Sequence, residues 1–509
     1  MAADFLVILT LLITLGLGLI YFPWIILALL IAIFIIVLLQ GSVELIASFL
    51  PLFPLKFSNP TLDRFVSIHI PSFNEPADIL KNTLKHLSLL KYKNYEVIVV
   101  DNNTVDEAVW KPVEKYCNEL GNNFKFFHVD KLEGFKAGAL NFAQNETSPE
   151  AEFIVVVDAD YEVKPQFLKE ALSYFVDDDV AFVQFPQAYM NITGENKGVA
   201  VEYEHFFKIY MKMANYFNCV PSTGTLVIFR RNVLNEIGFY DKKCLTEDAE
   251  IGTRLIEASR KGIYIDKVMG RGLMPYDIEA YKKQKSRWAC GNAQILKKDF
   301  LRILFDKRLN FKQKVCFFSE MTAWFNFTLI PILVIFLGSI GYNNNFIWKM
   351  SILISAFTIY LFFATKLVSF VATFANVYPT KYILRALFVH FGMVAVYSTT
   401  FIKSFLDTNF SFERTNKFIL PQKPSILKNT SIEIFIIIIS LMVGLNYFIN
   451  NNSVLAFTTF LIAINYLLIF YVYWEISPTK KYSAKLINEI KKSMAENKQS
   501  FSTNKSSFK

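Results

Sequence analysis

The sequence predicts a water-soluble α/β domain inserted between membrane-spanning α-helices, and three observations lead to that fold class. The 509 residues are 53% hydrophobic and only 19% charged. The apolar residues lie in long blocks toward both ends, whereas residues 59–308 have the composition of an ordinary globular domain. Within this middle part, short apolar runs alternate with stretches of helical spacing, which is typical of βαβ units and a Rossmann-like parallel sheet.

The first apolar block, residues 5–39, contains no charged side chain. A single helix of that length would rise about 50 Å, well beyond the roughly 30 Å hydrocarbon core of a bilayer. Gly16, Gly18 and Pro23 lie near its centre, where a short turn fits. We therefore expect two crossings, at about residues 4–21 and 24–41, within an N-terminal segment of residues 1–58. A cleaved signal peptide is not expected, because no basic region precedes the apolar run.

The middle part, residues 59–310, reads as one α/β domain. Its apolar runs predict strands at residues 65–70, 95–100, 124–129, 153–157 and 180–185. Helical spacing predicts helices at 77–90, 106–120 and 165–175, which would cover both faces of a parallel sheet.

Carboxylates follow several of these strands directly. Asp101 ends the second strand, and Asp158 and Asp160 end the fourth. Ligands of open α/β sheets bind beyond the carboxyl ends of the strands. Two carboxylates one residue apart suit a hard divalent cation beside a phosphate, because such cations take oxygen ligands. These acids predict a nucleotide pocket; the alternative for a single triplet is an acidic turn that merely ends a strand.

Two further stretches carry charges at predicted helix starts. Lys136 follows Gly134 where a helix begins, so it can meet the charge of a diphosphate, or it is simply a solvated lysine. Asp248 lies in the first turn of a helix that begins near Thr246. A carboxylate there stabilises the helix N-terminus and can also act as a general base.

Gln284, Arg287 and Trp288 share one face of a predicted amphipathic helix at the membrane boundary. Tryptophan at such a boundary is often only an anchor. The alternative is that its ring stacks on a sugar while Arg287 neutralises a leaving diphosphate.

The C-terminal region, residues 311–476, contains four predicted spans, at about 316–340, 346–372, 432–448 and 453–474. Residues 382–406 are apolar but include Arg385, His390 and Lys403, and are predicted to lie at the interface. The tail, residues 477–509, is rich in lysine. The positive-inside rule then places the tail and the α/β domain on the cytoplasmic side of the cell membrane.

The net charge of +9 fits contact with anionic lipid, and no nucleic-acid partner is needed to explain it. The five cysteines are scattered without a CxxC pair, which argues against a zinc site or a disulfide framework. Nothing in the sequence identifies a partner subunit.

The motifs, taken in order, carry a family resemblance. They are Asp101, the KAGALN stretch from Lys136, the Asp158-Ala-Asp160 triplet, Thr246-Glu-Asp248, and Gln284-x-x-Arg287-Trp288. This set resembles the membrane-integrated family 2 glycosyltransferases of the cellulose synthase, hyaluronan synthase and glucomannan synthase type. The resemblance covers residues 66 to about 291, reaches the C-terminal membrane region, and implies that the α/β domain has the GT-A fold.

The resemblance also implies roles. It makes Asp248 the base that deprotonates the acceptor, and Asp160 the ligand of Mg²⁺ or Mn²⁺. The residues implied to bind the nucleotide sugar are Asp101, Lys136, Asp158, Arg287 and Lys417. Those implied to border the acceptor are Gly224, Gln284 and Trp288. The pair of residues that usually precedes the small residue of the family's acceptor loop is altered around Gly224, which leaves the acceptor open.

Residues 407–420 include Phe412, Thr415 and Lys417 at the spacing F-x-x-T-x-K. This segment resembles the loop that covers the nucleotide in processive synthases; otherwise it is a basic loop at the lipid headgroups. The expected function is an inverting, processive hexosyltransferase that extends a β-linked polysaccharide from a UDP- or GDP-hexose and passes it across the membrane. The alternatives are a ceramide glucosyltransferase-like enzyme that adds one sugar to a lipid, and a scaffold or transporter with an inactive domain.

Overall fold

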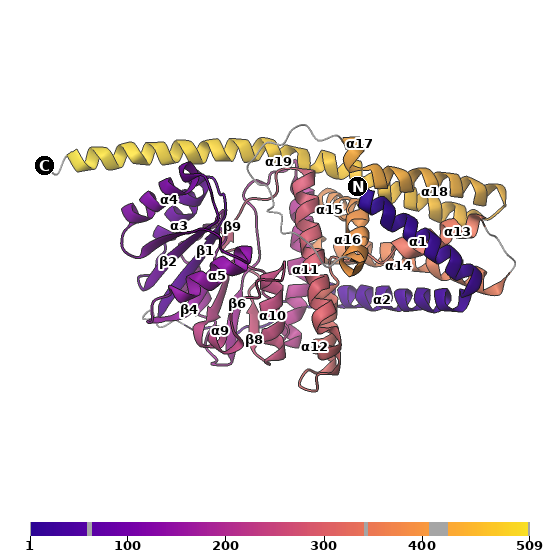
Figure 1. Ribbon diagram of the computed structural model, residues 1–509, viewed down its shortest axis with the longest axis horizontal. Coiled ribbons are helices and arrows are strands. Elements are labelled where there is room, and N and C mark those ends of the chain that lie inside the picture. Colours follow the sequence, from indigo (N-terminus) through magenta and orange to yellow (C-terminus); the bar gives the residue numbers. More distant parts are fainter. Residues whose placement is uncertain (1, 59–63, 341–344, 407–425, 507–509) are drawn as a thin grey trace.

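The computed structural model describes residues 2–58, 64–340, 345–406 and 426–506. An α/β domain forms one end of an elongated molecule and a bundle of apolar helices forms the other (Figure 1). Helices α11 (Ile278–Phe305) and α12 (Phe311–Met321) stand between them (Figure 1). The segment that directly follows the α/β domain in the sequence therefore forms the junction between the two parts.

A seven-stranded sheet organises the α/β domain, in the order β3-β2-β1-β4-β7-β6-β8. Strands β1 (Phe65–Ser72), β2 (Tyr95–Asn102), β3 (Phe124–Val129) and β4 (Ala151–Val156) are parallel and agree with the predicted strands. Their carboxyl ends consequently meet at one edge, as the sequence analysis expected.

The sheet is mixed, so the expectation of a wholly parallel sheet is wrong. Strand β7 (Val227–Arg230) lies antiparallel between β4 and β6 (Val180–Gln184), and β8 (Lys261–Tyr264) pairs parallel with β6. Both β7 and β8 span only four residues. They pair here because they complete the buried sheet, and an apolar run that short carries no clear strand period.

Helices cover both faces of the sheet, so that every residue of β2, the second strand from one edge, is buried. Val97 and Val99 face one hydrophobic cluster, and Ile98 and Val100 face another. Among the helices that provide the cover are α3 (Ala77–Ser88), α4 (Glu107–Leu120), α5 (Phe135–Asn145) and α6 (Phe167–Leu172). Alternate side chains of one strand thus enter two separate cores.

In the described parts of the chain, five helical stretches are long and apolar enough to cross a membrane. They are Pro23–Phe49, Phe346–Phe374, Thr380–Phe405, Ser431–Ile449 and Ser453–Ser477. The N-terminal block forms two helices, α1 (Ala2–Tyr21) and α2 (Pro23–Phe49), with Pro23 in the first turn of α2, where a missing N–H costs least. The apolar part of α1, Phe5–Tyr21, is shorter than these stretches.

The expected helix at residues 316–340 is interrupted. Helix α12 ends at Met321, and α13 (Leu329–Ile340) begins eight positions further along. The Asn326 side-chain oxygen accepts hydrogen bonds from the backbone N–H of Thr328 at 2.9 Å and from the Ser398 hydroxyl at 3.1 Å. Such local bonds compete with helix formation and explain the break.

Residues 382–406 do not form an exposed interfacial segment. They lie in α15 (Thr380–Gly392) and α16 (Val394–Leu406), whose side chains are mostly buried against other helices. Arg385, whose charge suggested the interface, forms an ion pair with buried Glu475 of α19 at 2.7 Å. Its charge is therefore compensated within the protein, and the segment is a candidate membrane span.

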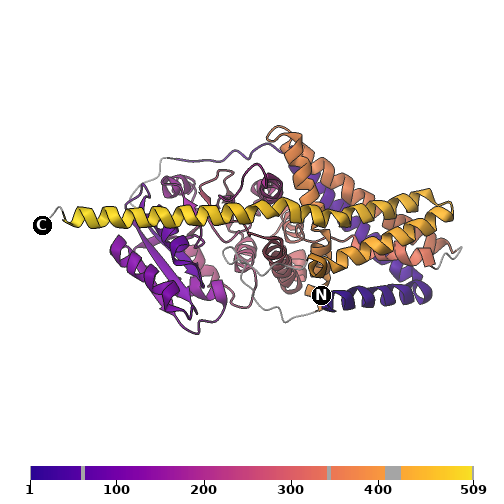
Figure 2. The same ribbon diagram turned by 90° about the horizontal axis from the view of Figure 1, so that it is seen from above.

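The C-terminal tail continues the last apolar helix. Helix α19 (Ser453–Ser506) leaves the bundle and lies across the α/β domain (Figures 1 and 2). Ile490 packs there with Ile79 of α3 and with Leu273. The tail is thus docked on the domain through an apolar contact.

Candidate active site

Six of the nine predicted site residues that the structure describes line one cavity beyond the carboxyl ends of the strands. The cavity encloses about 670 Å³ of empty space, part of which is open to solvent. The predicted residues in its wall are Lys136, Asp158, Asp248, Gln284, Arg287 and Trp288. They come from α5, α10 (Glu247–Glu257), α11 and the segment just after β4, so segments far apart in sequence build a single site.

Lys136 occupies the centre of the acidic wall. Its Nζ lies 2.6 Å from Asp158 Oδ1 and 3.6 Å from Glu247 Oε1, and it donates to the Gly224 carbonyl at 2.9 Å. Burial disfavours the ammonium, but Asp158, Glu247 and Asp248 outweigh this and raise the pKa of Lys136 above its usual value. The lysine is therefore held charged, beside the N-terminus of α5, where anions bind well.

Asp101 lies at the same sheet edge but outside this cavity wall. Its carboxylate accepts hydrogen bonds from Thr104 Oγ1 at 2.8 Å and Ser72 Oγ at 3.2 Å. His128 Nδ1 lies 2.9 Å from its second oxygen, and the ring of Trp110 stacks on His128. Sequence reasoning missed His128 and Trp110; their positions at the end of β3 and in α4 were the only signal available.

Asp160 is buried, and its Oδ2 accepts a hydrogen bond from the Leu273 N–H at 2.7 Å. It is near enough to raise the pKa of Tyr189, whose own burial is the larger cause. Tyr189 and Asp158 both line the cavity. Two carboxylates at one strand end, one of them oriented by a backbone N–H, fit the oxygen ligands that Mg²⁺ and Mn²⁺ prefer.

Asp248 projects from the first turn of α10, and its Oδ1 accepts a hydrogen bond from the Ala249 N–H at 2.9 Å. Burial and the adjacent charge of Glu247 raise the pKa of Asp248 to about 7, although Lys136 opposes the shift. A carboxylate with a pKa near neutrality suits a general base. Gly224 packs directly against it: a Cβ at residue 224 would lie 2.6 Å from Asp248 Oδ2.

Helix α11 presents Gln284, Arg287 and Trp288 to the cavity. The Tyr203 hydroxyl donates to the Gln284 side-chain oxygen, and the rings of Tyr203 and Trp288 meet edge to face, with centroids 5.9 Å apart. Trp324 lies 5.0 Å from Trp288, centroid to centroid. The aromatic residues thus fix the orientation of the Gln284-to-Trp288 face.

Lys285, on the same helix, is a residue that sequence reasoning passed over. It is fully buried and lies 2.9 Å from Glu202 of α7 (Lys197–Phe206). Its ammonium also lies over the rings of Tyr203 and Trp324, at 4.1 and 4.3 Å from their centroids. The Lys285 side chain therefore holds the Tyr203 and Trp324 rings in place from outside the cavity.

A second cavity, about 610 Å³ in volume, adjoins the first on the side of the helix bundle. Its lining is rich in aromatic side chains, among them Tyr203, Phe206, Phe207, Trp288 and Trp324. Asp248 and Trp288 line both cavities. Asp248, whose pKa is raised, thus lies where the two cavities meet. We call the first the charged cavity and the second the aromatic cavity.

The remaining predicted residues lie outside the described part of the chain. These are Phe412, Thr415 and Lys417 of the segment at residues 407–420. Their assignment to a loop that covers the nucleotide stays a prediction.

An α/β domain with acidic strand ends, a charged lysine and a carboxylate of raised pKa on one cavity is an arrangement typical of a group-transfer enzyme. The family models give the particular family. Residues 67–238 match "Glycosyl transferase family 2" and residues 153–402 match "Glycosyl transferase family group 2". Residues 67–402 thus carry family 2 glycosyltransferase domains, and the second match extends into the candidate membrane spans.

Curated relatives agree with this family. The chain is 27% identical over 258 residues to probable glucomannan 4-beta-mannosyltransferase 7 of Oryza sativa subsp. japonica, which covers 49% of this chain and 44% of the relative. It is 24% identical over 270 residues to a UDP-forming cellulose synthase catalytic subunit of Xanthomonas axonopodis pv. citri, covering 51% and 35%. The chain thus spans less than half the length of these relatives.

Among solved structures, the mannosyltransferase PcManGT from Pyrobaculum calidifontis, in complex with GDP-Man and Mn²⁺, is similar to this chain. The TM-score is 0.46 at 16% identity, and the match covers 71% of this chain and 97% of that one.

Proposed function

We propose that the protein is an inverting, processive hexosyltransferase. It transfers a hexose from a UDP- or GDP-sugar to a growing β-linked polysaccharide and passes the product through its own helices. The observation that carries this proposal is the position of Asp248, whose pKa is raised to about 7, at the junction of the charged and aromatic cavities. The relatives named as glucomannan and cellulose synthases support a polysaccharide product.

The charged cavity is the proposed donor site. Lys136 and Arg287 bring positive charge to it and would bind the diphosphate, with Lys136 released from Asp158 as the donor enters. Asp160, together with Asp158, would hold Mg²⁺ or Mn²⁺, and that cation would supply charge neutralisation of the leaving nucleotide. Asp101, at the same sheet edge, would contact the nucleotide from beyond the cavity wall.

The aromatic cavity is the proposed acceptor site. Trp288 and Trp324 offer ring faces on which sugar rings stack. Asp248 accepts the proton of an acceptor hydroxyl as that oxygen attacks the anomeric carbon. One displacement on the face opposite the nucleotide inverts the anomeric centre, so an α-linked donor gives a β-linked product.

The position of the aromatic cavity favours a polymer over a single-sugar lipid product. Trp324 lies in the break between α12 and α13. It packs against a hydrophobic cluster that includes Met393 and Tyr397 of the helix bundle. A chain extended from Asp248 would therefore enter the bundle directly. We also propose that the α/β domain faces the cytoplasm. Helix α19 continues from its apolar part into a lysine-rich part, and lysines next to a membrane span favour the cytoplasmic side.

A product assay with detergent-purified protein tests this function. Incubation with each radiolabelled UDP- or GDP-hexose, with and without Mn²⁺, should give a β-linked polymer with one donor only. Asp248→Asn should abolish the polymer, whereas Asp241→Asn, which removes a carboxylate paired with Lys298 nearby, should leave it unchanged. A product carrying one sugar on lipid would replace the processive proposal with the lipid-glycosylating one. Full turnover by Asp248→Asn would refute the assigned base.

A further inference from the structure

Two cysteines far apart in sequence meet beside the aromatic cavity. Cys219 follows α8 (Lys212–Phe217), and Cys316 lies on α12 with Glu320 one turn further along. The two sulfur atoms and a Glu320 carboxylate oxygen all lie within 4.8 Å of one another. All three residues are buried, with Glu320 only 1% exposed. The sequence spacing did not indicate a metal site, because the residues converge only through the fold.

The protein does not provide hydrogen-bond partners for both oxygens of the Glu320 carboxylate. Its Oε1 lies 3.2 Å from Cys316 Sγ, but its buried Oε2 has no hydrogen-bond partner. No lysine or arginine in the described residues forms an ion pair with it. A buried, unpartnered carboxylate oxygen costs free energy unless it binds a cation or a donor.

We propose that Cys219, Cys316 and Glu320 bind a thiophilic divalent cation, Zn²⁺, as a structural site. Two thiolates select zinc over the hard Mg²⁺ and Mn²⁺. For tetrahedral zinc with Zn–S of about 2.3 Å and Zn–O of about 2.1 Å, the ligand atoms should be about 3.6–3.8 Å apart. The three atoms already lie within 4.8 Å of one another, so binding would draw them together by about 1 Å at most. Glu320 also lines the aromatic cavity, so a water molecule from that cavity would complete the coordination.

Zinc is bound by thiolate and carboxylate groups, so its binding at this cluster would release the protons of the ligands to solvent.

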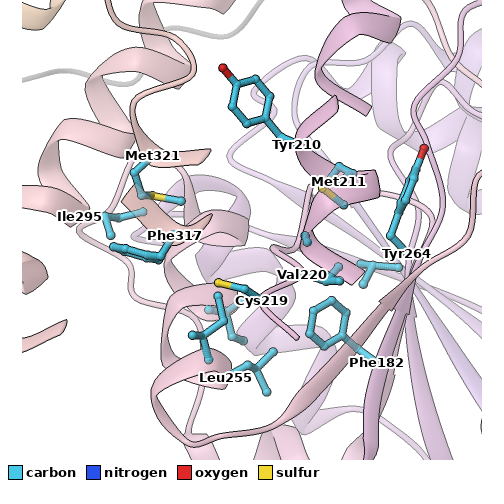
Figure 3. Packing of buried hydrophobic residues seen from close by; sticks show 14 of the residues in the cluster. Phe182, Tyr210, Met211, Cys219, Val220, Leu255, Tyr264, Ile295, Phe317 and Met321 are labelled. Carbon is cyan, nitrogen blue, oxygen red and sulfur yellow. The ribbon is translucent and has the colours of Figure 1, made fainter. Parts of the chain in front are cut away.

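The site would connect two walls of the aromatic cavity. Cys219 begins the segment that continues through Thr223 to Gly224, which packs on Asp248. Glu320 precedes Met321 and Trp324 in the opposite wall. Cys219 itself lies among apolar side chains such as Val220 and Phe317, so the two walls already touch there (Figure 3). A metal bond would fix the Gly224 segment to α12.

The test uses Co²⁺ as a spectroscopic probe of the full-length, reduced, detergent-purified protein in buffer containing excess Mg²⁺ and no donor sugar. We expect one equivalent of Co²⁺ to produce thiolate-to-cobalt charge-transfer absorption, which Zn²⁺ abolishes by displacement. Cys219→Ser or Cys316→Ser should remove this absorption. Glu320→Gln should weaken binding by at least about tenfold, since even an outer-shell partner of a metal ligand contributes that much.

Cys117→Ser is the matched control, because Cys117 is a buried thiol of α4 in a different hydrophobic cluster. It should keep the full absorption. Zinc should also raise the melting temperature of the wild type and of Cys117→Ser, and leave that of Cys219→Ser unchanged. No charge-transfer absorption in the reduced wild type, or unchanged absorption in Cys219→Ser, would overturn the proposal. Because no sugar is transferred in these measurements, their outcome is independent of the proposed activity.

Discussion

Replacing Gly224 with alanine should damage catalysis far more than folding. Gly224 has φ +79°, and a Cβ there would lie 2.6 Å from Asp248 Oδ2 and 3.1 Å from Asp248 Cγ. Relieving this contact to 3.4 Å requires a displacement of about 0.8 Å, the difference between the two distances. A misplacement of about 1 Å at a reacting group costs on the order of 100-fold in rate. We therefore expect kcat to fall between tenfold and about 100-fold.

Gly238→Ala separates this effect from backbone strain. Gly238 has φ +88°, but a Cβ there would meet only Arg254 Nη1, at an ordinary 3.7 Å. Both variants carry the cost of a left-handed alanine, about 1–2 kcal/mol. Nucleotide release at saturating donor measures kcat, and thermal unfolding measures stability. Equal kcat losses in the two variants, or wild-type kcat in Gly224→Ala, would refute the placement of Gly224 against the base.

Further perturbations test the charges of the site. Asp248 acts deprotonated, so kcat/KM should fall as the pH drops below about 7; Glu247→Gln removes a charge that raises this pKa and should move the acid limb of the profile to lower pH. An acid limb at the same pH as in the wild type would show that Glu247 does not raise the pKa of Asp248. Asp160→Asn should abolish transfer and leave the unfolding temperature nearly unchanged, and retained transfer would remove it from the proposed metal site. Lys285→Met should destabilise the protein by about 3–5 kcal/mol, because it leaves the buried Glu202 charge unpaired, and adding Glu202→Gln should recover most of the loss. Failure of the double variant to recover would show that the lysine acts through packing on the rings.

The sequence predicted those parts of the fold that depend on local pattern. Long apolar strands and the residues at their ends, such as Asp158, could be placed because parallel strands bring their carboxyl ends to one edge. Strand β7 could not, since its four residues form a strand only when β4 and β6 flank them. At the break before α13, Asn326 accepts a local hydrogen bond from Thr328 and a second one from Ser398, and only the assembled bundle provides the second.

Within the site, the residues that face the cavity were predictable from motif spacing, and those that support them were not. Glu202 and Lys285 are ordinary charged residues in the sequence and are recognisable only from their shared burial. Cys219 and Cys316 likewise lie 97 positions apart by their numbering, so no short motif joins them. Such contacts require the packing of α7, α8, α11 and α12, which no local pattern specifies.

The buried Glu202–Lys285 pair explains how α11 keeps the face that carries Gln284, Arg287 and Trp288 oriented toward the cavity. A buried ion pair adds little net stability, because desolvation offsets most of the attraction. Its contribution is positional. One residue of an α-helix corresponds to a rotation of about 100°, so a shift of α11 by a single position would turn Lys285 away from Glu202 and leave both charges buried and unpaired. The Glu202 carboxylate also accepts from the Tyr281 hydroxyl at 2.7 Å and from the Tyr397 hydroxyl of α16 at 3.4 Å. The same charge therefore ties α11 to the helix bundle and holds Gln284, Arg287 and Trp288 at the cavity.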